Sequence, residues 1–206
     1  MGQPEERLPL FPLGLVILPT ELVPLHIFEE RYKLMIGECL EDESEFGIVW
    51  LADDGLREVG CSASVEQVLE RMPDGRLNIL VRGQRPFRLA RRIEDMPYPA
   101  GDVEFLDDEE AVPDEELAAE ARETYADLVQ HVTDERPPVD QLAELSSYGM
   151  AATIELSPEP KQALLEERSE DARLRVVSQL FELALQRLEK AEEAQETARS
   201  NGKVRF

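Results

Sequence analysis

The sequence is poor in the residues that most often build catalytic or metal centres. It has two cysteines, Cys39 and Cys61, and two histidines, His26 and His131, each isolated along the chain. Structural zinc sites need clusters of such side chains at short spacings, so this scatter argues against a metal site. Two cysteines also do not suggest a disulfide-rich secreted domain, and we interpret both as buried free thiols. We therefore expect no cofactor and no metal.

Common enzyme motifs are missing as well. The sequence contains no Gly-x4-Gly-Lys-Ser/Thr phosphate loop, no Gly-x-Gly-x-x-Gly dinucleotide motif and no Gly-x-Ser-x-Gly nucleophile elbow. The acidic pairs Asp53-Asp54 and Asp107-Asp108 have the composition of turns and solvated loops. We expect a protein that is not an enzyme.

Positive charge is scarce, because 22 basic residues stand against 45 acidic ones and the formal net charge is −23. Such a field opposes binding to nucleic acid and to anionic membranes. One segment differs from this background and contains Arg82, Arg85, Arg88, Arg91 and Arg92, with Phe87 among them. Our favoured interpretation is that these arginines pair with the acidic helical part of the chain.

The same basic segment supports an alternative hypothesis. Arginines interleaved with an aromatic side chain are typical of nucleic-acid-binding surfaces. The candidate residues for RNA binding by a barrel of this kind are Arg82, Arg85, Phe87 and Arg88.

The sequence also lacks an unbroken apolar run long enough to cross a membrane, which takes roughly 20 residues. Its longest apolar stretch, Leu8–Phe28, is interrupted by Pro9, Pro12, Pro19 and Pro24. Proline clashes inside a helix but is tolerated at strand starts, edges and bulges. The stretch therefore predicts two short strands, near 7–13 and 21–26, joined by an apolar loop. Because no basic segment with an apolar core opens the chain, we expect no signal peptide and a cytoplasmic protein.

Strand patterns continue to about residue 106, after one predicted helix at 29–40. The segment Phe46–Ala52 is almost continuously apolar, which indicates a strand buried on both faces. Apolar residues alternate strictly at Leu77, Ile79 and Val81, directly after a Pro-Asp-Gly turn. About six short strands with tight turns predict a small barrel or sandwich.

Helical spacing replaces strand alternation after the acidic stretch that follows residue 106. Apolar residues recur at spacings of three and four over 117–132 and 174–188. Shorter helices are predicted over 140–151 and 158–167, the second with Ser157 as its cap. We expect a β-rich part over 7–106, a helical part over 112–190 and a flexible tail over 191–206. This order is the α+β pattern.

The apolar opening stretch has two possible uses. Most of its residues must fill the core, but an exposed apolar patch would be a binding site. The candidate protein-binding residues are Leu15, Leu18, Leu22, Leu25 and Phe28.

Three segments resemble a known family. They are LPLFPLGLVILPTELVPLHIFEERYKLMI at 8–36, GCSASVEQVLE at 60–70 with the Pro73–Ile79 and Gly83–Arg88 segments that follow, and the weaker EPKQALLE at 159–166. Together they are similar to the LON domain, the N-terminal substrate-binding domain of ATP-dependent Lon proteases. The N-terminal domain of cereblon is of the same type.

The resemblance implies a small PUA-like β-barrel followed by an α-helical bundle, and a role in recognising protein substrates. A Lon protease continues into an ATPase module and a Ser-Lys protease domain, whereas this sequence ends at Phe206. It therefore resembles the stand-alone LON-domain proteins, and the resemblance offers no catalytic residue to transfer.

Our leading hypothesis is a non-enzymatic protein-binding module that recognises unfolded or apolar segments in protein quality control. Its partners would be such segments, or a protease or chaperone. Nucleic acid and membranes are not expected partners, although RNA binding remains the alternative. A small-ligand pocket or an unrecognised hydrolase is a third hypothesis, supported by no motif.

Overall fold

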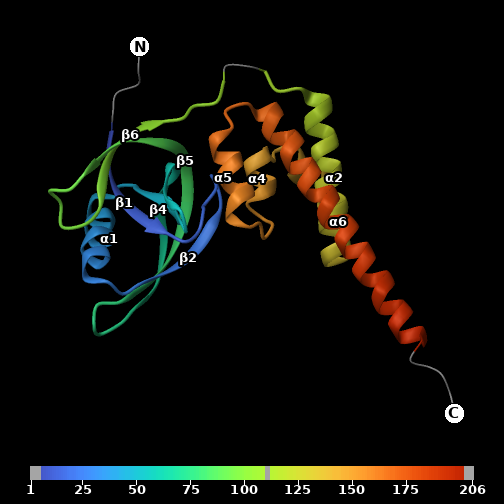
Figure 1. Cartoon of the computed structure of the whole chain (residues 1–206), viewed down its shortest axis with the longest axis horizontal. Helices are drawn as coiled ribbons and strands as arrows, with labels where there is room; N and C mark the ends of the chain where they lie inside the picture. Colours follow the sequence, from blue (N-terminus) through green and yellow to red (C-terminus); the bar gives the residue numbers. More distant parts are fainter. Residues whose placement is uncertain (1–5, 110–111, 202–206) are drawn as a thin grey trace. The chain divides into compact units, whose positions relative to one another are not determined.

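The computed structural model describes residues 6–109 and 112–201 (Figure 1). The chain divides into two compact units, one of residues 1–110 with 151–169 and the other of residues 111–150 with 170–206. All the strands described lie in the first unit. The sequence-based division expects every helix after residue 112 in a separate helical part. The structure differs, because it groups helix α5 (Pro158–Glu166) with the strands.

The first unit contains a six-stranded sheet. Its strands are β1 (Glu6–Leu13), β2 (Leu22–Ile27), β3 (Phe46–Ala52), β4 (Gly55–Arg71), β5 (Leu77–Ile93) and β6 (Ala100–Phe105). β1 runs parallel to β3 and antiparallel to β6, and the long β5 pairs with both β4 and β6. These pairings close five strands into a barrel, while β2 is added to the first half of β5. The predicted α+β class and small barrel are confirmed.

Phe87 of β5 fills the interior of this barrel. It is fully buried among Leu8, Leu10, Val49 and Val103. Two glycines leave space for its ring, because an added Cβ would lie 2.6 Å from a ring carbon at Gly47 and 2.8 Å from one at Gly60. Real Cβ atoms do not approach so closely, so glycine at both positions makes room for the Phe87 ring in the barrel interior.

The apolar loop between β1 and β2 lies directly against β5. An added Cβ at Gly83 would be 2.1 Å from the Leu18 carbonyl oxygen, so only glycine permits this approach. The Gly83 amide donates to the Glu21 carbonyl, and the Thr20 amide donates to the Gly83 carbonyl. Leu18 is buried by this packing, and its amide donates to the Glu21 carboxylate at 2.9 Å.

Two helices cover the barrel unit. α1 (Glu30–Asp42) buries Tyr32, Met35 and Ile36, and the Tyr32 and Phe11 ring centroids lie 4.2 Å apart. This helix extends through Asp42, two residues beyond the end of the helix predicted at 29–40. α5 is joined to the loop before β2 by the ion pair of Lys161 with Glu21. Pro158 opens α5 as predicted, but the Ser157 side chain makes no capping hydrogen bond.

The second unit is helical. It contains α2 (Glu115–Thr133), α3 (Val139–Ala143), most of α4 (Ser147–Ala151) and α6 (Glu170–Asn201). α2 packs on α6, with the Tyr125 and Phe181 ring centroids 5.6 Å apart. The single helix predicted over 140–151 is two short helices. The predicted tail from residue 191 is helical through Asn201, and its last part, 202–206, lies outside the described residues.

Candidate functional site

β2 is the edge strand of the sheet. Within the described chain it pairs with β5 on one side and has no strand on the other. Leu22 at its start is 45% exposed, and Phe28 just after its end is 59% exposed. Pro24 lies in the middle of the strand and has no N–H to donate, which hinders the addition of another strand. The edge therefore presents apolar side chains rather than a continuous backbone template.

An open groove of about 550 Å³ adjoins the end of β2, and we call it the Phe28 groove. Its lining includes Leu13, His26, Phe28, Leu51 and Leu56. Leu51 is 52% exposed although it is a large apolar residue. Exposed apolar side chains that gather around one groove are typical of a binding site rather than of scattered surface leucines.

A second open groove, of about 620 Å³, lies on the other side of His26, and we call it the Leu69 groove. Its lining consists of Pro24, Leu25, His26, Leu69, Glu70, Asn78 and Ile79. Leu69 is 50% exposed, whereas Ile79 is buried. Because His26 lines both grooves, an extended chain could occupy them in succession.

A chain of polar side chains runs through the Leu69 groove from β4 to β2. The Asn78 amide Nδ2 donates to Glu70 Oε2 at 2.9 Å, and Asn78 Oδ1 lies 2.6 Å from His26 Nδ1. A carboxylate only accepts hydrogen bonds, so the amide nitrogen of Asn78 must face Glu70 and its oxygen must face His26. The proton of the neutral His26 ring therefore lies on Nδ1, and Nε2 is left as an acceptor.

The five predicted protein-binding residues differ in how exposed their side chains are. Leu22 and Phe28 are exposed, and Leu15 and Leu25 are half-buried. Leu18 has no exposed surface, so its predicted role in binding is wrong. It belongs to the core because the loop that contains it packs against β5 at Gly83.

Sequence reasoning missed several residues of this surface. Leu51 and Leu69 come from β3 and β4, which are distant in sequence from the apolar opening stretch. The apolar patterns of β3 and β4 indicate buried or half-buried strands. Neither pattern shows which side chain of its strand remains exposed. The adjacent Val68 and Leu69, which break the alternation of β4, were the one available signal.

The basic segment of β5 does not form the aromatic platform of the alternative hypothesis. Phe87 is in the barrel core and has no face free for a base. Arg82 is paired with Glu66 at 2.9 Å, and its hydrogen bond lowers the pKa of that carboxyl. The Arg85 guanidinium lies 3.6 Å from the centroid of the Phe105 ring. The exposed Arg88 remains as the fourth candidate.

The partners of these arginines also differ from our expectation. Arg91 pairs with Asp102 on β6, and Glu66 of the Arg82 pair lies on β4. Both of these partners are in neighbouring strands, whereas the prediction placed the partners of the arginines in the helical part. Arg91 and Arg7 hydrogen-bond to Asp102 and hold the pKa of its carboxyl below the usual range.

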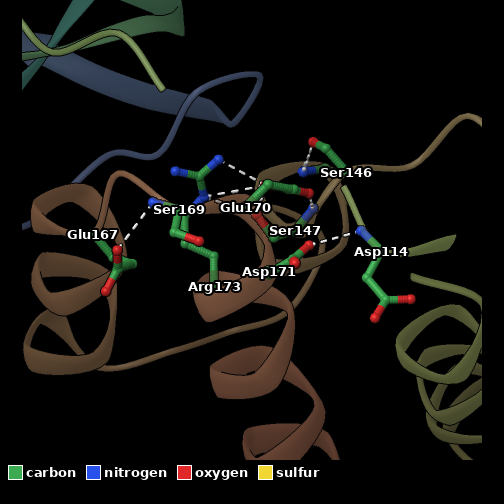
Figure 2. Close-up of polar contacts among 9 residues, drawn as sticks. Asp114, Ser146, Ser147, Glu167, Ser169, Glu170, Asp171 and Arg173 are labelled. Atoms are coloured by element: carbon green, nitrogen blue, oxygen red, sulfur yellow. Dashed lines mark hydrogen bonds and ion pairs between the residues drawn. The ribbon is translucent and has the colours of Figure 1, made fainter. Parts of the chain in front are cut away.

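A second polar cluster lies where α4 and α6 begin (Figure 2). Ser147 donates to the Glu170 carboxylate through both its amide, at 2.8 Å, and its hydroxyl, at 2.6 Å. Arg173, which is buried, donates to Glu170 at 2.7 Å and to the Ser147 hydroxyl at 3.0 Å. Arginine stays protonated and cannot act as a base for this serine. The cluster therefore joins the starts of two helices.

In the described ranges, 6–109 and 112–201, no group of three or more His, Cys, Asp or Glu side chains could hold a metal ion. No helix in the described part of the chain has the length and apolar character needed to cross a bilayer.

One known protein family matches both the strands of the barrel and most of the helices of this chain. The family model described as the ATP-dependent protease La (LON) substrate-binding domain matches residues 7–182. This chain belongs to the LON substrate-binding domain family. The match includes β1–β6 and α1–α5, together with the first part of α6.

Lon proteases are among the relatives of this LON domain. The Lon protease of Roseiflexus castenholzii is 28% identical over 208 residues, which cover 93% of this chain and 26% of that protein. The Lon protease of Anaeromyxobacter dehalogenans is 25% identical over 192 residues, which cover 84% of this chain and 23% of that protein. The chain thus spans about a quarter of the length of the curated relatives it matches.

Solved structures show the same fold. The Lon N-terminal domain protein from Xanthomonas campestris matches with a TM-score of 0.63 and 26% identity, covering 82% of this chain and 95% of that one. The N-terminal domain of Mycobacterium avium complex Lon protease matches with a TM-score of 0.69 and 21% identity, covering 86% and 98%. These matches confirm the predicted LON-type fold.

Proposed function

We propose that this LON domain is a non-enzymatic module that binds apolar segments of other proteins at the Phe28 groove. Its partners would be unfolded segments, or a protease or chaperone that works with it in cytoplasmic quality control. Membership of a substrate-binding family supports a protein-binding role. The main structural support is the exposure of two large apolar side chains, Phe28 and Leu51, that both line this groove.

The energetics favour an extended segment over a single side chain. Burying one large apolar side chain contributes about 1.5–3 kcal/mol. Association itself costs about 4–15 kcal/mol in lost translational and rotational freedom. Several apolar contacts are therefore needed for stable binding, and one groove residue cannot provide them. A segment that passes from the Phe28 groove into the Leu69 groove would bury Leu69 in addition to Phe28 and Leu51.

The experiment is a fluorescence anisotropy titration with a labelled apolar peptide. Phe28→Asp places a charge in the groove and should weaken binding by about tenfold or more, the usual effect of losing a central aromatic contact. Leu183→Asp is the matched control, because Leu183 is 50% exposed but belongs to α6 and does not line the groove.

Both variants should keep the thermal unfolding midpoint of the parent protein, since both side chains are exposed. Equal binding by Phe28→Asp and the parent would remove the Phe28 groove as the site. Failure of the parent itself to bind apolar peptides would overturn the proposed function.

A further inference from the structure

The Leu69 groove combines apolar walls with a single charge. Of its seven lining residues, Glu70 alone is charged, and Leu69 and Pro24 are exposed apolar side chains beside it. The Phe28 groove differs, because its charged residues are of both signs: Glu29, Arg31 and Arg92. Of these two grooves, the Leu69 groove therefore has the one-sided electrostatic preference, and it is for positive charge.

The polar chain in this groove adds a second acceptor. Asn78 fixes the His26 ring with its proton on Nδ1, as the direction of the Asn78–Glu70 hydrogen bond requires. In the described ranges, 6–109 and 112–201, no protein donor is bound to His26 Nε2. The ring is exposed, and its stacking on Phe28, with centroids 5.8 Å apart, restrains it. The residues that line the groove thus include two hydrogen-bond acceptors, which are the Glu70 carboxylate and Nε2 of the neutral His26 ring.

We propose that the Leu69 groove binds a lysine or arginine side chain of the apolar segment. The aliphatic stem of such a side chain would lie on Leu25 and Leu69, and its charged end would reach Glu70 and His26. The net charge of −23 favours the same class of ligand over a neutral or acidic one. This inference rests on the proposed function and names its substrate class, which is apolar segments that contain a basic residue.

The test uses three labelled peptides that differ at one position, which is lysine, norleucine or glutamate. Norleucine keeps the apolar stem and removes the charge. The parent protein should bind the lysine peptide about threefold to fivefold more tightly than the norleucine peptide, as expected of an exposed ion pair. Added salt should reduce this preference, because it screens exposed charges.

Charge reversal provides the decisive variant. Glu70→Lys should bind the glutamate peptide more tightly than the lysine peptide, which reverses the order found with the parent. The matched control is Glu58→Lys, which changes the net charge equally, because Glu58 is an exposed acid on the same strand but does not line the groove. This control should keep the parent's preference for lysine.

The outcomes separate the two proposals. If the parent binds the lysine and norleucine peptides equally and Glu70→Lys does not reverse the order, the basic-residue inference is wrong while apolar binding stands. If the parent binds none of the peptides, the proposed function fails first. If Glu58→Lys reverses the order as fully as Glu70→Lys, the preference arises from net charge and not from the groove.

Discussion

The sequence contains two candidate binding surfaces, one apolar and one basic, which lie on the neighbouring strands β2 and β5. They differ in whether their side chains already have partners within the sheet. In the sheet, Leu22 of the apolar edge strand β2 is paired directly with Arg82 of the basic strand β5. Arg82 and Arg91 have acidic partners on the adjacent strands β4 and β6. Leu22, Phe28 and Leu69 remain exposed. The charges of Arg82 and Arg91 are thus compensated locally within the sheet, whereas apolar area at the edge stays exposed.

The largest expected effect comes from a pair of substitutions that tests which apolar residues belong to the exposed surface at the β2 edge. Leu18→Asp would place an unpaired charge at a site with no exposed area, so we expect the protein not to fold. Leu22→Asp, at 45% exposure, should change the free energy of unfolding by less than about 1 kcal/mol. Circular dichroism shows whether each variant is folded, and urea unfolding gives its free energy of unfolding. A folded Leu18→Asp variant would contradict the assignment of this loop to the core.

The second prediction tests the basic strand. Phe87→Ala removes the aromatic side chain that fills the barrel and should lower the free energy of unfolding by about 3–5 kcal/mol. Arg88→Ala, at the adjacent exposed position, should change it by about 0.5 kcal/mol or less. Urea denaturation gives both values. If Phe87→Ala were as stable as the parent, the ring could not be a core residue and the RNA hypothesis would regain its aromatic group.

The smallest effect concerns the charges that are already paired. Arg91 and Arg7 hold the pKa of Asp102 below its usual range, so ionised Asp102 stabilises the folded state. This contribution is complete above the carboxyl's ordinary pKa and is lost as the pH falls through the lower pKa of the folded state. Asp102→Asn should therefore flatten the dependence of unfolding free energy on pH below about pH 4. Coincident pH profiles for this variant and the parent would show that Asp102 makes no such contribution.

Much of the fold could be predicted from local pattern. The apolar run Phe46–Ala52 coincides with β3, and the strict alternation at Leu77, Ile79 and Val81 lies in β5. Proline spacing correctly divided the opening stretch into β1 and β2. These predictions succeed because the period of apolar residues reflects which faces of an element are buried. The resemblance to LON domains then supplied the barrel as a whole.

Burial of individual residues could not be predicted in the same way. Leu18 and Leu22 are the same residue type in one apolar stretch, yet one has no exposed surface and the other is 45% exposed. The difference arises because the loop packs against Gly83, whereas β2 has a strand on one side alone within the described chain. The amino-acid composition of the stretch does not indicate which of its leucines is packed in this way.

The composite site depends even more on folding. His26 and Asn78 are 52 positions apart, and Asn78 reaches Glu70 only across the β4–β5 pairing. Local sequence therefore specified the elements and the family, since both depend on short-range pattern. The grooves, the orientation of the His26 ring and the local pairing of the arginines arise from strand register, which brings distant residues together and is not encoded in any one segment.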